Sequence, residues 1–453
     1  MTRLLTRAAL VTLVVSLPAW LPGRVVALRN RIFARVNGDE GLAIPGDVVG
    51  IEDFKRVYAD PAAGGRSKGA ALSDLFWYWL APGPEVHQEH LEAGPRYDQV
   101  ARTTRQILVK TKKESEELTE RVTRHVLDEL DVGEGALVRL RDTVMPIWAE
   151  LYYELVFGEP CPREARELIV GNADDVVSAL KCVRPRNMRR RERLTNYVLR
   201  RLGDVPHELP SLLSTKEQAY YLQGAFFNTA VVQMSEAMAH LLMAVAQHPE
   251  VQRRLAGNPG DDGYLDAVID ESLRVFPLFG IAHRISTADI ELGDTTIAAG
   301  TVLCFSYPGY HRAGYEHTDT FDPGRWARRA AKDSNFIPFG VTQNRACPAR
   351  GLAPLTMRVV TREVLRRFTL SSTAGHTRSI PNRGPCLFVP RESGRSRRGV
   401  LAWLAVRDRW EDVWRSLAQL VFGTYMVLDA RKKRLTETYF ETEEPRCPMR
   451  SEA

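Results

Sequence analysis

The stretch from Asn335 to Arg350 reads NFIPFGVTQNRACPAR, and it contains a single cysteine, Cys347. A segment of helical character, GLAPLTMRVVTREVLRRF, follows directly, so the cysteine lies between a turn-rich loop and the N-terminal end of a helix. The helix dipole and the nearby Arg345 and Arg350 favour a negatively charged thiolate. This position suits a metal ligand, whereas the other interpretation of a cysteine beside a proline is a buried structural thiol.

Two further motifs precede the cysteine loop. Glu271 and Arg274 are three residues apart, which places both side chains on one face of a helix. The segment FDPGRW, residues 321–326, supplies a second arginine, Arg325, which can complete a charge-assisted triad with that pair. We expect this structural triad to hold the loop that carries Cys347.

The three motifs occur in the same order as those of the cytochrome P450 superfamily, which this chain resembles. Within the cysteine loop and the following helix the matching residues are Phe339, Gly340, Arg345, Cys347, Ala349, Leu352 and Ala353. The resemblance covers roughly residues 31 to 392. It implies a mainly α-helical fold with small β-sheets, in which a haem lies between a long central helix and the helix after the cysteine loop. Strand-like runs broken at Gly293 and Gly300 predict a hairpin of the small sheet.

The resemblance also implies a cofactor and its ligands. The cofactor would be haem b, iron protoporphyrin IX, with Cys347 as the iron ligand. Phe339, Arg345 and Arg284 would be further cofactor-binding residues, and Arg284 would contact a haem propionate. The loop has one residue more than usual before the cysteine, and residues 341–344 occupy a turn where the family has a second glycine.

The long apolar segment from 215 to 247 resembles the family's central helix, which crosses above the haem. Counting back from His248 places Val232 and Gln233 where the family has an acid followed by threonine. A match one turn upstream would place Asn228 and Thr229 there, but it requires a gap of one turn in a helix. Gln233 and Thr229 are therefore the candidate catalytic residues on this side of the haem.

A thiolate-ligated haem favours cleavage of an O–O bond and oxidation of unactivated C–H bonds. The first interpretation is therefore a monooxygenase that acts on a lipophilic or biosynthetic small molecule, with atypical proton delivery because the acid and the alcohol are replaced. It implies an electron-transfer partner, either a ferredoxin or a flavoprotein reductase. The second is a haem-thiolate enzyme that uses peroxide or rearranges its substrate. The third is a domain, with or without haem, that recruits partners and has little activity.

The composition is consistent with these interpretations. The six cysteines are scattered without paired metal spacings, which indicates neither a disulfide framework nor a zinc site, and favours a reducing compartment. The formal net charge of +6 suits an acidic redox partner or an anionic membrane surface as readily as no partner at all. We expect no nucleic-acid partner.

The N-terminal residues 1–30 contain an apolar run from Ala8 to Leu21, which is short for a membrane span of about 20 residues. Leu17 lies where a secretory cleavage site would need a small residue. Four arginines follow within residues 24–35, a flank that tends to remain cytoplasmic. We expect an uncleaved anchor or interfacial helix with a cytoplasmic catalytic domain, residues 31–393. A secretory signal and a soluble cytoplasmic protein are the alternatives.

A C-terminal extension, residues 394–453, lies beyond the resemblance. It begins with a basic linker and continues with apolar residues spaced three and four apart, which predict an amphipathic helix. These are Trp403, Val406, Trp410, Val413, Trp414, Leu417, Leu420 and Val421. Packing against the main body is the default expectation, and a membrane surface or a partner protein are the alternatives.

Overall fold

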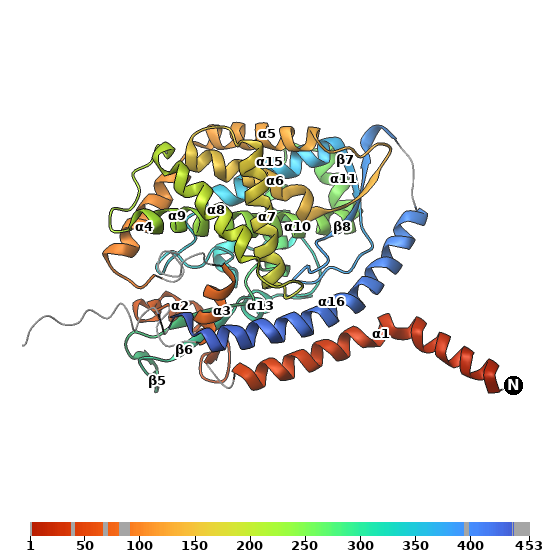
Figure 1. Cartoon of the computed structure of the whole chain (residues 1–453), viewed down its shortest axis with the longest axis horizontal. Helices are drawn as coiled ribbons and strands as arrows, with labels where there is room; N and C mark the ends of the chain where they lie inside the picture. Colours follow the sequence, from red (N-terminus) through yellow and green to blue (C-terminus); the bar gives the residue numbers. More distant parts are fainter. Residues whose placement is uncertain are drawn as a thin grey trace, which may run out of the picture.

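The computed structural model describes residues 2–37, 41–66, 71–80, 91–393, 398–436 and 438 (Figure 1). Helices make up most of this part of the chain, and the strands form three small sheets. The mainly α-helical fold with small β-sheets that the sequence predicts is therefore confirmed. Of the basic linker expected at 394–398, residues 394–397 lie outside the described residues, as does the end of the C-terminal extension at 439–453.

The α-helices are α1 (Thr2–Asn37), α2 (Phe54–Ala59), α3 (Ala71–Leu80), α4 (Pro95–Leu108), α5 (Lys112–Asp128), α6 (Leu140–Phe157), α7 (Arg163–Leu180), α8 (Met188–Arg201), α9 (Thr215–Leu222), α10 (Val231–Gln247), α11 (Pro249–Gly257), α12 (Asp262–Val275), α13 (Tyr307–Arg312), α14 (Arg325–Arg328), α15 (Leu352–Arg367) and α16 (Arg398–Lys433). A π-helix, η4 (Gln223–Ala230), joins α9 to α10. The strands are β1 (Leu42–Ile44), β2 (Ala136–Arg139), β3 (Ile281–Ile285), β4 (Ile290–Leu292), β5 (Thr295–Ile297), β6 (Val302–Ser306), β7 (Phe368–Ser371) and β8 (Pro385–Pro390).

The centre of the helical body is α10. Every residue from Met234 to Ala246 is buried, and α6, α7, α12 and α15 pack around the helix. An all-round apolar sequence is typical of a helix surrounded by other helices. The charged exception is Glu236, whose carboxylate lies 2.7 Å from Arg141 Nη1 and 2.7 Å from Lys181 Nζ. Two cationic partners compensate the burial of this carboxylate.

The three sheets are small. In the first, β6 pairs with β1 in parallel and with β3 antiparallel. In the second, β8 lies between β2 and β7, and all pairs are antiparallel. The third is the hairpin of β4 and β5, whose turn uses Gly293 at a φ of 60°, so the hairpin predicted at this glycine is present.

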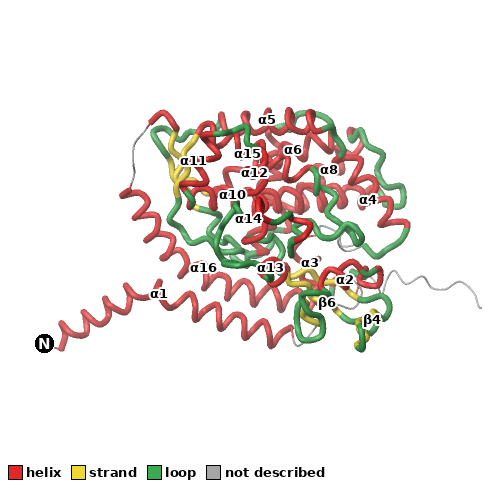
Figure 2. Tube along the Cα trace, turned by 180° about the vertical axis from the view of Figure 1, so that it is seen from behind, coloured by secondary structure: helices red, strands yellow, loops and turns green. Residues whose placement is uncertain are grey.

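The two longest helices, α1 and α16, lie side by side along one edge of the body, with α16 between α1 and the other helices (Figures 1 and 2). Arg29 Nη1 on α1 donates to Gln419 Oε1 on α16 at 3.0 Å. Further along, a Cβ added at Gly423 would lie 3.0 Å from Phe33 Cζ, so the glycine permits the close approach of the helices. The boundary expected at residue 30 falls inside α1, which continues without a break to Asn37.

The extension helix α16 is present and packs against the body, but the apolar face expected to make this contact points elsewhere. Of the predicted stripe, Val413 is buried, whereas Trp403, Val406, Trp410, Trp414 and Val421 are exposed. The opposite side of the helix contacts the body through ion pairs and through buried apolar residues, among them Leu404, Met426 and Val427. Shared helical spacing identifies a common face but not what that face meets, so α16 packs on the body as expected but mostly through residues outside the predicted stripe.

Two helical segments are long and apolar enough to cross a membrane, judged by length and composition alone. The first, Val11–Val36, is 6% buried, and the second, Thr215–Gln247, is 83% buried. The second contains the core helix α10, so its apolar character is explained by the packing of the body.

Candidate active site

A cavity lies between the central helix and the cysteine loop. Cys347 faces it from the loop, and Thr229 and Gln233 face it from η4 and α10. Most of the remaining lining is apolar, and includes Ala225, Phe226, Ala230, Met234, Ala237, Leu278, Phe339, Ala349, Ala353 and Met357. The described residues that line it include no carboxylate. Such a lining suits a largely apolar ligand held in orientation by a few polar groups.

The backbone of the cysteine loop is turned tightly beneath this cavity. Cys347 donates its N–H to the carbonyl of Phe339 at 2.9 Å, and Gly340 donates to Ile337 at the same distance. Gly340 has a φ of 72°, and a Cβ there would lie 3.2 Å from Tyr58 Oη, so only glycine satisfies both the turn and the contact. The loop thereby presents the Cys347 side chain to the cavity.

Asn344 fixes the altered turn of the cysteine loop to a distant segment of the chain. Its side-chain amide donates to the carbonyls of Tyr58, Asp60 and Ala63 at 3.2, 3.0 and 3.2 Å, and the residue is buried. Arg345 follows with a φ of 54°, an uncommon conformation for a residue with a side chain. The altered turn at 341–344 is visible in the sequence, whereas these hydrogen bonds of Asn344 are not, because their partners lie far away in the chain.

The predicted triad assembles in the interior. Arg274 contacts both carboxylate oxygens of Glu271 at 2.9 Å, and Arg325 Nε lies 3.3 Å from Glu271 Oε1. Two groups that sequence analysis missed complete the shell: the indole N–H of Trp326 donates to Glu271 at 3.1 Å, and the N–H of Asp322 donates at 2.9 Å. The FDPGRW segment therefore supplies three donors to one buried carboxylate, of which only the arginine was expected.

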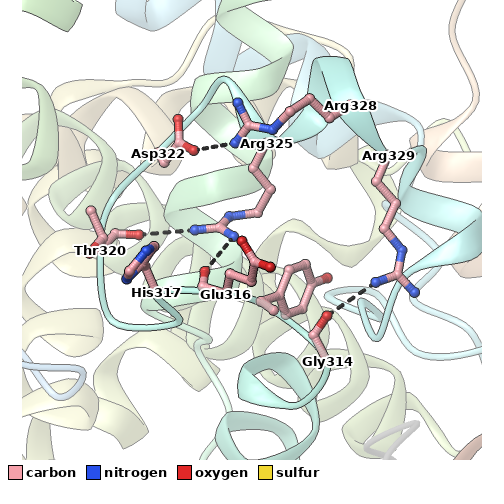
Figure 3. Close-up of a pocket in the computed structure, with 9 residues that line it drawn as sticks. Gly314, Glu316, His317, Thr320, Asp322, Arg325, Arg328 and Arg329 are labelled. Atoms are coloured by element: carbon pink, nitrogen blue, oxygen red, sulfur yellow. Dashed lines mark hydrogen bonds and ion pairs between the residues drawn. The ribbon is translucent and has the colours of Figure 1, made fainter.

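The outer side of the triad forms a separate pocket, shown in Figure 3. Its lining includes Arg325, whose guanidinium donates to the carbonyls of Glu316 and Thr320 at 3.1 and 3.4 Å (Figure 3). Arg329 donates to the carbonyl of Gly314 at 3.2 Å. These contacts fix the backbone around the triad, and the pocket lies apart from the cavity that contains Cys347.

Three arginines line the cavity: Arg66, Arg284 and Arg345. Arg284 is buried, lies 3.8 Å from the ring centre of Tyr58 and donates to the carbonyl of Asn344 at 3.3 Å. Arg345 lies 4.3 Å from the ring centre of Tyr97. The structure thus brings Arg284 and Arg345 together, as the sequence analysis expects, and adds Arg66, which no motif indicates.

This donor set fits a haem. A thiol on one wall would meet the iron, the apolar walls suit the porphyrin, and guanidinium groups are the usual partners of carboxylates such as the propionates. Phe339 lines the same cavity, which agrees with its expected contact. The thiol also influences its neighbours: burial first, and then the charge of Cys347, raise the pKa of the Tyr152 phenol above its ordinary value.

The central helix contributes one residue from each of its two alignments to the cavity. Both Thr229 and Gln233 face the cavity, whereas Val232 is buried in the core. Asn228 turns away, accepting from Asn172 at 2.6 Å and donating to the carbonyl of Leu80 at 2.7 Å. The π-helix η4 ends directly before α10 and changes the spacing of side chains, a feature often found at functional sites.

Comparisons with known proteins agree with this geometry. The family model described as cytochrome P450 matches residues 163–395. A Mycobacterium tuberculosis protein named cytochrome P450 135B1 is 34% identical over 139 residues, which cover 28% of this chain and 29% of that protein. The steroid 17-alpha-hydroxylase/17,20 lyase of Squalus acanthias is 27% identical over 173 residues, or 33% of this chain and 34% of the relative. The matches thus span about a third or less of these curated relatives.

Solved structures extend the similarity to most of the fold. CYP175A1 from Thermus thermophilus aligns with a TM-score of 0.56 at 18% identity, covering 73% of this chain and 88% of that one. A zebrafish cytochrome P450 solved with abiraterone aligns with a TM-score of 0.60 at 17% identity, covering 75% and 89%. With the family model matching half of the sequence, this chain belongs to the cytochrome P450 family.

Proposed function

We propose that this chain is a haem-thiolate monooxygenase that oxidises a lipophilic small molecule. The observation that carries the proposal is the position of Cys347 across an apolar cavity from Thr229 and Gln233. Haem b, when bound, supplies the chemistry that inserts an oxygen atom into a C–H bond. Cys347 would hold its iron, Arg66, Arg284 and Arg345 would pair with its propionates, and Phe339 would pack on its face.

Thr229 and Gln233 would have different hydrogen-bonding roles on the substrate side of the cavity. The threonine hydroxyl can both donate and accept a hydrogen bond, so it can hold a proton-carrying water in place. The glutamine amide donates through nitrogen and accepts through oxygen, but it has no titratable proton. Gln233 therefore orients water or a substrate hydroxyl, and the protons have to come from Thr229, from water or from the substrate.

The same observation supports a second candidate, a peroxide-using or rearranging haem-thiolate enzyme. The described lining of the cavity includes no carboxylate. In neither alignment of the central helix does an acid precede the alcohol position, because Val232 precedes Gln233 and Asn228 precedes Thr229. An enzyme that receives its oxygen already reduced, or that only rearranges a substrate, has no need of an acid–alcohol relay. Supplying a reduced electron donor and hydrogen peroxide separately, and measuring product with a panel of lipophilic substrates, distinguishes the two.

Electron supply would come from the side of Cys347 that faces away from the substrate. A surface cleft there contains Cys347 together with several basic residues: Arg105, Lys110, Lys112, Arg345, Arg350 and Arg358. A cationic surface attracts a negatively charged partner. We therefore propose an acidic ferredoxin or flavoprotein reductase as the donor, and expect Lys110→Glu to slow reduction by that donor more strongly at low than at high salt.

For location, we propose membrane association with the catalytic domain, residues 31–393, on the cytoplasmic side. The support is the exposed apolar segment of α1, including Val11, Val14 and Val15, followed by basic residues in its second half. Residues 1–30 would then serve as the anchor and 394–453 as an extension. Removing residues 2–23 from the full chain should weaken its association with membranes, which flotation with vesicles measures.

A further inference from the structure

The extension helix α16 presents a continuous apolar stripe to solvent. Its members follow each other at steps of three, four or seven residues along the helix, so they share one face. The exposed members are Trp403, Val406, Trp410, Trp414, Val421, Tyr425 and Leu428. Trp414 is 72% exposed and Val421 62% exposed, although residues of these types are normally covered. A stripe of this length on a soluble surface marks an interaction site.

The opposite side of α16 is fixed to the body by specific contacts, so the stripe cannot rotate inward. Asp408 is buried and accepts from the N–H of Gly375 at 2.7 Å. Asp429 accepts from the Tyr78 hydroxyl at 2.6 Å. These contacts lie about six turns apart on the helix. The orientation of α16 is therefore set by the body.

The acidic and basic residues of α16 also differ in where they lie. All four acidic residues between 398 and 433 take part in ion pairs: Asp408 and Asp412 with Arg415, Glu411 with Arg139, and Asp429 with Lys433. The exposed cations beside the stripe and at its ends include Arg398, Arg409 and Lys432. The surface that remains for a partner is thus apolar at its centre and cationic around it, which complements an anionic surface.

The neighbouring helix α1 continues this surface. It packs along α16, and its own exposed residues include Trp20 and Leu28 together with Arg31 and Arg35. Tryptophan and tyrosine beside arginine and lysine are typical of the boundary between lipid headgroups and acyl chains. A protein partner would require a complementary groove, whereas a bilayer accepts an exposed stripe of this kind without one.

We propose that α16 lies in the plane of an anionic lipid bilayer, with the stripe from Trp403 to Leu428 inserted at the headgroup boundary. This is a second membrane contact beside α1, and it does not depend on which reaction the cavity performs. Because α16 is fixed to the body, the contact determines how the catalytic domain is oriented. Helix α5, which contributes to the basic cleft near Cys347, lies on the opposite edge of the molecule and stays accessible to a soluble electron donor (Figures 1 and 2).

The tryptophans of α16 are native probes for this proposal. In full-length protein with Trp20→Phe, the tryptophans outside α16 are Trp77, Trp79, Trp148 and Trp326, all buried or half-buried. The protein is mixed with phosphatidylcholine vesicles with or without phosphatidylglycerol, whose acyl chains are either brominated or unmodified. We expect brominated chains to quench the fluorescence, more strongly when phosphatidylglycerol is present. Adding Trp403→Phe, Trp410→Phe and Trp414→Phe should remove this quenching, while the apolar phenylalanines keep the stripe bound to the vesicle.

A matched pair of variants tests whether the lipid contact is specific to the stripe or common to any exposed valine. Val421 lies on the stripe and is 62% exposed, and Val109 is a valine of the body that is 74% exposed. Val421→Glu should reduce the lipid quenching several-fold, and Val109→Glu should leave it unchanged. Because α1 alone can keep the chain on the vesicles, flotation cannot isolate the contribution of α16, whereas quenching of the α16 tryptophans reports that helix directly.

Two outcomes would overturn the proposal. In the first, the α16 tryptophans of vesicle-bound protein stay accessible to aqueous acrylamide and insensitive to brominated lipid. In the second, they are shielded from acrylamide without vesicles and the protein sediments as a dimer, which would mean that a second copy covers the stripe.

Discussion

The side-chain amide of Asn344 donates to the main-chain carbonyl of Asp60 at 3.0 Å and so joins the cysteine loop to a segment 284 residues earlier. Asn344→Ala would remove this donor from the carbonyls of Asp60, Tyr58 and Ala63, which would keep the N–H of Ala63 or the guanidinium of Arg284 as donors. We expect a loss of stability of about 1 kcal/mol and weaker haem retention, because one buried side chain would lose its hydrogen bonds to the distant segment. Thermal unfolding and haem loss to an acceptor protein measure the two effects. Gln343→Ala, at an exposed neighbouring position, should change neither, and equal behaviour of the two variants would disprove this role of Asn344.

Loss of the triad carboxylate should reduce stability more than loss of the Asn344 side chain. Glu271→Ala would leave Arg274 and Arg325 buried without their common carboxylate, and removing one member of a buried ion pair costs about 3 to 5 kcal/mol. The variant should lose haem incorporation and unfold at a clearly lower temperature. Arg328→Ala is the control, because Arg328 is exposed and pairs with Asp322 at the surface. An Arg325→Ala variant that binds haem and melts like the wild type would count against the triad.

The buried pair of His240 and His376 predicts how stability depends on pH. Their ring nitrogens lie 3.0 Å apart, and burial lowers the pKa of His240 to about 3 and that of His376 to about 2. In the unfolded chain both histidines bind a proton near pH 6.5, so between pH 6.5 and 3 the unfolded state binds more protons than the folded state. Stability should therefore fall as the pH falls, by up to about 1.4 kcal/mol per pH unit for each histidine.

Replacing one histidine of this pair tests that slope. His376→Gln should flatten the acid side of a plot of unfolding free energy against pH, measured with urea at several pH values. His125→Gln serves as the control because His125 is exposed. Parallel curves for the wild type and His376→Gln would show that the pair does not set the acid sensitivity.

Position 233 is where an acid can be returned to the cavity. Val232 is buried in the core, so Val232→Asp would place a carboxylate in an apolar interior and cost several kcal/mol rather than restore a relay. Gln233→Glu keeps Thr229 and adds an acid facing the cavity. If the native reaction uses O2, this variant should form more product per electron pair consumed. Gln233→Leu should form less, and equal coupling in all three proteins would contradict a role for this side chain.

The fold and the cysteine side of the site can be predicted from the sequence, because each is indicated by short motifs. Cys347 and the Glu271–Arg274 pair are local patterns whose spacing already fixes the relevant geometry. Asn344 and Arg66 have no such pattern, since their roles depend on segments that meet only in the folded chain. The position of Thr229 relative to Gln233 depends on a π-helical turn, and helical periodicity assumes that no such turn exists.

The extension illustrates the same limit. Its apolar spacing predicts a helix with one apolar face, and α16 is that helix. The surroundings of this face depend on residues outside it, because Asp408 and Asp429 bind the opposite side of the helix to the body. Ion pairs between distant residues, such as Glu411 with Arg139, cannot be read from the spacing within one segment.

The central claim is that Cys347 binds the iron of a haem, and the carbon monoxide difference spectrum of the reduced protein tests it most directly. The wild type should give the band of a thiolate-ligated haem. Cys347→Ala should lose that band, and Cys304→Ala, which replaces a cysteine of the β6 strand, should keep it. A thiolate-type band that persists in Cys347→Ala, or its absence from haem-loaded wild-type protein, would contradict the account.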